Sequence, residues 1–271
     1  MEDNILTRIA ARAAERAEAA KKEVSPEEME ERALRRLEED AAAGTETFRF
    51  EKALSGGDIG FICECKKASP SKGLIAPDFP YLDIARDYEA AGAACISVLT
   101  EPYWFMGSDR YLEEIAGAVK IPCIRKDFTV DPYMIYEAKT LGASAVLLIC
   151  ALLPEEELRA DIEICDRLGL SALVEAHDED EIASALRAGA RMIGVNNRNL
   201  KDFTVDVHNS ERLRKLVPPQ VLFVAESGIR TSADIDVLRA AGVNGVLIGE
   251  TLMRASDKKA VLDGLRGRGA R

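Results

Sequence analysis

A short stretch in the middle of the chain reads Ile121-Pro122-Cys123-Ile124-Arg125-Lys126-Asp127-Phe128. It starts as an apolar strand after a proline and ends on a cation, and Asp131-Pro132 follows as a helix N-cap with proline at the first helical position. A strand that ends on Lys126 and leads into a helix places an ammonium group at the carboxyl end of a sheet, where α/β proteins bind ligands. A lone lysine there would be an ordinary surface residue, but other strands of this chain also end on reactive groups.

Apolar runs on both sides of this stretch alternate with helical patterns. The eight runs span residues 60–65, 94–99, 122–125, 145–149, 171–175, 191–195, 221–225 and 245–248. Eight strands, each followed by a helix, predict an α/β fold, a (β/α)8 TIM barrel. At 271 residues the chain is long enough for one such domain.

The connections between helices and strands repeat along the chain. Gly-containing turns precede the second, fourth, sixth and eighth strands, namely Ala91-Gly92-Ala93, Leu141-Gly142-Ala143, Ala188-Gly189-Ala190 and Ala241-Gly242-Val243. Strands three and seven instead follow Pro122 and Pro218-Pro219. This even/odd alternation is typical of a barrel built from repeated two-strand units, so it favours the barrel over an open, doubly wound sheet.

The first part of the chain differs in composition from the rest. Residues 5–22 are rich in Ala, Arg and Glu, and Ser25-Pro26-Glu27-Glu28 is typical of a second helix start with a capping box. We therefore expect an N-terminal helical extension (1–55) that packs on the barrel mouth, followed by a catalytic barrel (56–271). The alternative is a solvated, charged appendage, because the apolar stripe of these helices is thin.

Charge and hydropathy exclude several classes of partner. A net charge of −11 argues against a nucleic acid or an anionic membrane, although an anionic metabolite could still bind where cations gather. No apolar run approaches the roughly 18 residues of a membrane span. The Met-Glu-Asp-Asn start lacks the apolar region of a secretion signal, so we expect a cytoplasmic protein. We also expect a monomer.

The six cysteines show no Cys-x-x-Cys spacing. They are residues 63, 65, 95, 123, 150 and 165. Five lie in or beside apolar strands and Cys165 lies in a helical pattern, so we expect buried thiols rather than metal ligands or disulfides.

Alternation along a strand indicates which strand-end residues face the barrel interior. Glu64 and Lys66 share a face on the first strand, Lys126 and Phe128 share one on the third, and Glu175 ends the fifth. The other polar strand ends are Asn196 and Arg198 after the sixth strand, Glu226 at the seventh and Glu250 after the eighth. Ion pairs such as Glu64 with Lys126 are the structural alternative, but desolvating so many charges without a function is costly.

The last two strand ends suggest a phosphate site. Ser227-Gly228 precedes the helix start Thr231-Ser232-Ala233-Asp234, and Gly249 follows the eighth strand. Backbone N–H groups near helix N-termini after strands seven and eight bind phosphate in many barrels. An ordinary turn is the alternative for Ser227-Gly228 taken alone.

Aromatic residues follow the second strand as Tyr103-Trp104-Phe105, which includes the only Trp. With Phe128 they could form a wall against a flat apolar ring, or they could only pack on the barrel rim. Since His177 and His208 are the only histidines, proton transfer would fall to Lys and Glu. We expect His177 simply to begin the helix after strand five.

Five motifs are specific to one protein family. They are Cys63-Glu64-Cys65-Lys66-Lys67-Ala68-Ser69-Pro70-Ser71-Lys72-Gly73, Arg125-Lys126-Asp127-Phe128, Leu173-Val174-Glu175, Gly194-Val195-Asn196-Asn197-Arg198-Asn199-Leu200 and Ala225-Glu226-Ser227-Gly228-Ile229. Through them the chain resembles, from about residue 45 to its end, indole-3-glycerol phosphate synthase of tryptophan biosynthesis. The resemblance implies a carboxy-lyase that converts 1-(2-carboxyphenylamino)-1-deoxyribulose 5-phosphate to indole-3-glycerol phosphate, CO₂ and water.

The resemblance also implies roles for individual residues. Lys126 would be the general acid at the substrate's keto oxygen, Glu175 would transfer a proton during the later loss of water, and Glu64 would stabilise the developing positive charge. The implied catalytic residues are Glu64, Lys66, Lys126, Glu175, Asn196 and Ser227. The implied substrate-binding residues are Ser69, Phe105, Phe128, Arg198, Leu200, Glu226, Gly228, Gly249 and Glu250. The chain departs from common forms of the family at Trp104 and at Glu250, where a Ser often helps to bind phosphate.

No metal or cofactor is implied, because decarboxylation after ring closure restores conjugation by itself. Two alternatives remain open from the sequence. One is a Schiff-base lyase that uses Lys126 as an amine nucleophile. The other is an inactive barrel that docks partners through its N-terminal helices.

Overall fold

A closed barrel of eight parallel strands forms the centre of the computed structural model, which describes residues 4–198 and 204–267. The strands are β1 (Gly60–Cys65), β4 (Cys95–Leu99), β5 (Cys123–Lys126), β6 (Ala145–Ile149), β7 (Ser171–Ala176), β8 (Met192–Asn196), β9 (Leu222–Glu226) and β10 (Gly245–Ile248). Each strand pairs in parallel with its neighbours in chain order, and β1 closes the circle against β10. The predicted (β/α)8 barrel is confirmed.

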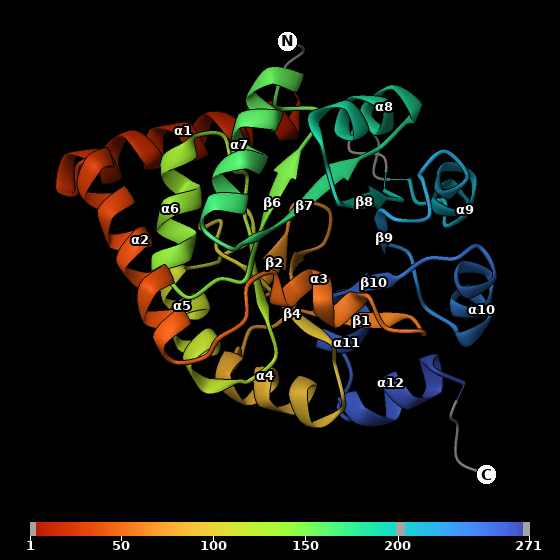
Figure 1. The fold of residues 1–271 in the computed structure, drawn as a ribbon. Helices are drawn as coiled ribbons and strands as arrows, with labels where there is room; N and C mark the ends of the chain where they lie inside the picture. The colour runs from red at the N-terminus through yellow and green to blue at the C-terminus, as the bar shows by residue number, and fades with distance from the viewer. Residues whose placement is uncertain (1–3, 199–203, 268–271) are drawn as a thin grey trace.

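Helices cover the outside of the barrel (Figure 1). They are α4 (Tyr81–Ala90), α5 (Asp109–Ala118), α6 (Pro132–Thr140), α7 (Glu155–Arg167), α8 (Glu179–Ala188), α9 (His208–Arg214), α10 (Ser232–Ala240), α11 (Glu250–Met253) and α12 (Lys258–Leu265). Helix α6 begins as its sequence predicts, since Asp131 caps the N–H of Tyr133 and Pro132 takes the first helical position. None of the helices in the described residues combines the length and apolar character that crossing a bilayer requires.

The repeated Gly turns connect a helix tightly to the strand that follows it at β4, β6, β8 and β10. The glycines before β4, β6, β8 and β10 all have positive φ, namely Gly92, Gly142, Gly189 and Gly242. Because an L side chain is disfavoured in that left-handed region, the sequence repeat has a direct conformational cause.

The core has an inner and an outer layer. Inside the barrel, alternate strand residues such as Ile62, Ile124, Leu147 and Leu173 pack against one another. The intervening residues face the surrounding helices and form the larger outer layer. All six cysteines are free thiols, and all but the half-buried Cys150 are buried.

Three helices precede the barrel and lie at different places on it. Helix α1 (Ile5–Glu23) is capped by Asn4, α2 (Pro26–Ala42) lies against α6, and α3 (Arg49–Leu54) lies at the start of β1 (Figure 1). Phe50 and Leu54 of α3 are fully buried and join the inner core at the amino-terminal end of the strands. The extension therefore contacts the barrel at more than its mouth.

Buried ion pairs attach this extension to the barrel. Lys139 of α6 lies 2.7 Å from Asp40 of α2, and Arg16 of α1 makes two hydrogen bonds, of 3.0 and 2.7 Å, to Asp127 after β5. Both Lys139 and Asp127 are almost fully buried. Breaking such pairs would leave an uncompensated buried charge, so α1 and α2 are held specifically.

A short hairpin lies in the loop after β1. It consists of β2 (Ala68–Ser69) and β3 (Gly73–Leu74), and Ala68 donates its N–H to the carbonyl of Phe105 at 3.2 Å. The sequence did not indicate this hairpin, which joins the loops after β1 and β4 beside the barrel mouth.

Candidate active site

One pocket opens at the carboxyl ends of the strands. The sequence-predicted site residues that line it are Glu64, Lys66, Ser69, Phe105, Lys126, Phe128, Glu175, Asn196, Arg198, Glu226, Ser227, Gly228, Gly249 and Glu250. Leu200, the remaining predicted residue, lies outside the described residues. Ile5, Leu6 and Ile9 of α1 also line the pocket and give it an apolar side.

Glu64 and Lys66 form the first charged pair at the base of the pocket. Lys66 Nζ lies 2.6 Å from Glu64 Oε1, and Ser97 donates its hydroxyl to Glu64 Oε2 at 3.3 Å. Burial would raise the pKa of Glu64, but Lys66 and Lys126 outweigh it, so the pKa lies below its usual range. A Cβ atom at Gly249 would come within 2.5 Å of Glu64 Oε1, so this glycine leaves room for the carboxylate.

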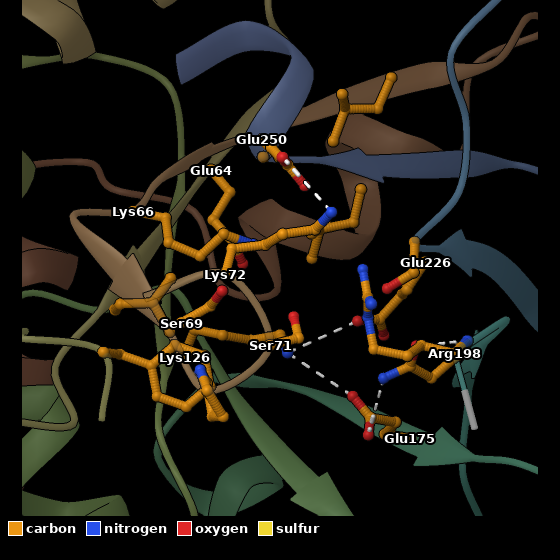
Figure 2. A pocket seen from close by; sticks show the side chains of 18 of the residues that line it. Glu64, Lys66, Ser69, Ser71, Lys72, Lys126, Glu175, Arg198, Glu226 and Glu250 are labelled. Atoms are coloured by element: carbon orange, nitrogen blue, oxygen red, sulfur yellow. Dashed lines mark hydrogen bonds and ion pairs between the residues drawn. The ribbon is translucent and has the colours of Figure 1, made fainter. Parts of the chain in front are cut away.

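Lys126 lies between two other carboxylates. Its Nζ is 3.5 Å from Glu175 Oε2 and 3.6 Å from Glu226 Oε2, and Figure 2 shows the three groups converging from three strands. Burial favours the neutral amine, but Glu226 and Glu175 outweigh it and raise the pKa of Lys126. The ion pair suggested by the sequence, Glu64 with Lys126, is therefore replaced by Lys66 with Glu64, while Lys126 pairs with Glu175 and Glu226.

Glu226 has an unusual environment for a carboxylate. It is fully buried at the end of β9, and its Oε1 has no hydrogen-bond partner among the described residues. Burial and the nearby Glu175 and Glu64 raise the pKa of Glu226 to about 7, even though Lys126 opposes them. Glu226 can therefore gain or lose a proton near neutral pH.

Two neighbours of Lys126 that the sequence analysis did not assign to the site hold its strand end in place. Arg125 is buried and pairs at 2.7 Å with both Asp109 and Glu137. Asp127 accepts hydrogen bonds from Arg16, from the hydroxyl of Thr100 at 2.7 Å and from the N–H of Phe128 at 2.8 Å. The run Arg125-Lys126-Asp127 at the end of an apolar strand could have indicated these two roles. If Lys126 faces the barrel interior, the charges on either side of it face outward and need partners there.

The aromatic side of the pocket comes from two loops. The rings of Phe105 and Phe128 lie 6.2 Å apart, tilted by 40°, and both line the pocket. Of the predicted Tyr103-Trp104-Phe105 wall only Phe105 takes part, because Tyr103 is exposed and stacks edge-on against Trp104. Glu101, missed from the sequence, is fully buried and accepts hydrogen bonds from the backbone N–H groups of Tyr103, Trp104 and Phe105.

The opposite side of the pocket has the features of an anion site. Ser227 (φ 68°) and Gly228 (φ 84°) both lie in the left-handed region before α10, whose N-cap is Thr231. Consecutive backbone N–H groups in such a turn can point at one anion. Lys72 and Arg230 also line this side, and neither was among the predicted site residues.

Glu250 places a carboxylate near this anion site. Its Oε1 accepts a hydrogen bond from Arg254 Nε at 3.1 Å and lies 3.9 Å from Lys72 Nζ (Figure 2). Two cations therefore offset a charge that would repel a phosphate.

Comparison with known proteins identifies close relatives. A family model described as indole-3-glycerol phosphate synthase matches residues 6–265. The chain is 58% identical over 263 residues to the indole-3-glycerol phosphate synthase of Ruminiclostridium cellulolyticum, covering 97% of this chain and 99% of the relative. It is 60% identical over 208 residues to the protein of the same name from Endomicrobium trichonymphae, covering 77% and 81% of the two chains.

Solved structures of more distant proteins share the fold. A 3-hexulose-6-phosphate synthase matches with a TM-score of 0.61 and 16% identity, over 78% of this chain and all of the other. A thiamine phosphate pyrophosphorylase from Pyrococcus furiosus matches with a TM-score of 0.57 and 17% identity, over 78% and 94% of the two chains. At this identity the likeness concerns the barrel alone.

Proposed function

The chain belongs to the indole-3-glycerol phosphate synthase family. We propose how the residues at the mouth of its barrel catalyse the synthase reaction. The enzyme closes, decarboxylates and dehydrates 1-(2-carboxyphenylamino)-1-deoxyribulose 5-phosphate to indole-3-glycerol phosphate in tryptophan biosynthesis. The observation that supports our assignment best is Lys126, half-buried between Glu175 and Glu226 in a pocket with an aromatic side. The other catalytic groups are assigned around it.

Ring closure needs positive charge at the substrate's keto oxygen. Attack by the aromatic ring carbon turns this oxygen into an alkoxide, and the ammonium of Lys126 stabilises it and donates a proton. The raised pKa of Lys126 keeps the group protonated before substrate arrives. Glu226 is one of the two carboxylates beside Lys126. When it takes up a proton near pH 7 it loses its negative charge, and Lys126 then becomes a stronger acid.

Decarboxylation follows from the charge formed in the first step. Ring closure leaves an iminium-like cation, which accepts the electron pair of the breaking C–C bond as CO₂ leaves. Glu64, whose lowered pKa keeps it ionised, stabilises this cation, and Lys66 at 2.6 Å binds the substrate carboxylate until it is lost. These reaction steps require no metal or cofactor.

Dehydration completes the aromatic indole. Glu175 removes the proton from the ring carbon while a lysine protonates the leaving hydroxyl, so one C–H and one C–O bond break and water forms. Asn196 donates to Glu175 Oε1 at 3.5 Å and orients it. Lys66 is the alternative to Lys126 as the proton donor in this step.

Phosphate and ring binding are assigned to the two flanks of the pocket. Backbone N–H groups of Ser227, Gly228 and Gly249 hold the phosphate, supported by the nearby cations of Arg198, Arg230 and Lys72. Phe105, Phe128 and the apolar residues of α1 enclose the anthranilate ring. Ser69 and the backbone of Glu250 are the remaining substrate-binding groups that we assign. Leu200 stays a prediction.

A Schiff-base mechanism is disfavoured by the same electrostatics. An amine nucleophile must be neutral, whereas the carboxylates around Lys126 favour its ammonium form. We expect indole absorbance to appear when purified protein is mixed with the substrate, and no adduct to be trapped by borohydride. A trapped adduct on Lys126 would contradict this mechanism.

We also propose that residues 1–55 act as an extension that completes the mouth of the barrel formed by residues 56–271. The support is that Ile5, Leu6 and Ile9 line the pocket and Arg16 bonds to Asp127. Removing residues 1–44 should leave a folded barrel by circular dichroism and raise KM by about tenfold, a loss of roughly 1.4 kcal/mol in binding. An unchanged KM would assign the extension to structure alone.

We infer finally that the chain acts as a cytoplasmic monomer without nucleic-acid partners. The support is that a single chain supplies the charged, aromatic and anion-binding sides of the pocket, and that the net charge is −11. Light scattering of the purified protein at working concentration tests the monomer.

A further inference from the structure

His177 lies closer to the catalytic carboxylates than its sequence position suggested. It follows β7 two residues after Glu175, and its Nε2 is 3.4 Å from Glu175 Oε1. On its other side Nδ1 lies 3.0 Å from Glu181 Oε2 of α8. The side chain is mostly buried, with only 18% of it exposed. Nε2 has no hydrogen-bond partner among the described residues, so the imidazole contacts Glu175 as an ion pair on one side and hydrogen-bonds to Glu181 on the other.

Without this residue, the charges at the base of the pocket are unequal once Glu226 has lost its proton. Glu64, Glu175 and Glu226 carry three carboxylates there, while Lys66 and Lys126 carry two ammonium groups. A protonated His177 would supply the third positive charge.

The groups around His177 favour its protonated form. Burial lowers the pKa of His177, but hydrogen bonding to Glu181 and the charges of Glu175 and Glu226 outweigh it, so the pKa lies above its ordinary 6.5. The Glu181 carboxylate also accepts the backbone N–H of His177 at 2.8 Å, and Asn209 of α9, a neutral residue, donates to the His177 carbonyl at 3.3 Å.

We propose that His177 is a positioning residue which, as an imidazolium held by Glu181, places a positive charge beside Glu175 and orients this carboxylate to remove the ring proton. This inference rests on the role proposed above for Glu175. His177 does not touch the reacting atoms and accepts no proton in the reaction. It acts through the electrostatic stabilisation of one form of its neighbour.

The proposal predicts the direction of a pH effect. An imidazolium next to carboxylates makes them harder to protonate, and His177 is one of the two groups, with Lys126, that hold down the pKa of Glu226. Removing it should therefore let the coupled carboxylates bind their first proton at higher pH. The acid limb of the dehydration rate, followed in single turnovers, should move up in pH, because this step comes after the loss of CO₂ and does not enter kcat/KM.

The activity test compares the two histidines of the chain. His177→Gln should move the acid limb of the dehydration rate up by about one pH unit, and so lower this rate about tenfold on the acid side and much less at high pH. His208→Gln is the matched control, because His208 also pairs with a glutamate, at 3.3 Å, but is exposed on α9. A limb that stays in place for His177→Gln, or moves equally for both variants, would overturn the proposal.

A second measurement does not depend on catalysis. The imidazole ¹H signals of His177 can be followed against pH, with His208→Gln giving the assignment. We expect the midpoint of His177 to fall by about one pH unit in both Glu181→Gln and Glu175→Gln. Unchanged midpoints would show that the charge pairs do not form and would overturn the proposal even if His177→Gln failed to fold.

The two measurements separate this inference from the proposed mechanism. If Glu175→Gln kept full turnover, the role of Glu175 would be wrong although His177 still titrated as expected. If Glu175→Gln lost turnover while the His177 midpoints stayed unchanged, only the inference about His177 would fail.

Discussion

The two sides of the pocket bind charge in different ways. On the side of β1, β5, β7 and β9, buried side chains of opposite sign lie within 4 Å of one another, and Lys126 has carboxylates at 3.5 and 3.6 Å. On the side of the β9–α10 and β10–α11 loops, Ser227 and Gly228 form a left-handed turn, whose backbone N–H groups we propose as the phosphate site. The first side suits charges that develop during a reaction, and the second suits a charge that stays constant.

Because of this difference, we expect substitutions on the two sides to change different kinetic constants. Interactions made only in the transition state lower kcat when lost, whereas interactions with an unchanging phosphate raise KM. Four substitutions test the comparison, from the largest expected effect to the smallest.

Lys126→Met should give the largest loss. It removes the ammonium but keeps most of the side-chain volume, so the barrel should fold while turnover falls by at least about 10³-fold with little change in KM. Single-turnover kinetics with the substrate measure this. Lys139→Met is the control, because Lys139 is also buried in an ion pair, to Asp40, but lies outside the pocket. Near-normal turnover of Lys126→Met would contradict its assignment as the acid and make Lys66 the next candidate.

Glu175→Gln should slow a later step by about 10²-fold, the lower range for a positioned proton-transfer group. Since ring closure and loss of CO₂ precede this step, a decarboxylated but still hydrated intermediate should accumulate during a single turnover. Quenched samples analysed by mass spectrometry would detect it. If only substrate and product were seen, Glu175 would act earlier or not at all.

Glu226→Gln should make the protein more stable at high pH. The folded pKa of about 7 lies above the ordinary 4.5, so Glu226 destabilises the fold progressively as pH rises from 4.5 to 7 and fully above that. The substitution should therefore raise the free energy of unfolding by about 1–3 kcal/mol at pH 8 and far less at pH 5. Urea denaturation at both values measures this, with the exposed Glu163→Gln as control. An equal change in the free energy of unfolding at both pH values would contradict the raised pKa of Glu226.

Ser227→Ala should have the smallest effect, on the phosphate side. It leaves the backbone N–H groups in place and removes one hydroxyl, so KM should rise about tenfold or less, with kcat within about twofold. Ser227→Gly should give the same KM, because it also lacks the hydroxyl, while relieving the strain of a positive φ at a non-Gly residue. A large loss of kcat in either variant would mean that the two sides do not divide the work as proposed.

The predicted parts of the site were those that follow from local pattern. Glu64, Lys126 and Glu175 were identified because a residue at the carboxyl end of a barrel strand must face the mouth, whatever lies opposite it. Glu101 and Asp127 were missed because their role is to bind backbone or another charge on a loop that the pattern does not place. His177 was expected to begin α8; the structure instead places it just before Asp178, the N-cap, with Nε2 against Glu175.

The sequence by itself determined the barrel and the polar strand-end residues at its mouth. Strand periodicity, Gly turns and helix caps act over a few residues, so they can be read without knowing distant contacts. Only the tertiary structure decided that Lys66 pairs with Glu64 and Lys126 with Glu175 and Glu226, that Glu226 titrates near neutral pH, and that Arg16 of α1 reaches Asp127. These features depend on distances of a few ångströms between strands far apart in sequence and on how completely water is excluded, because burial and opposite charge compete at each group.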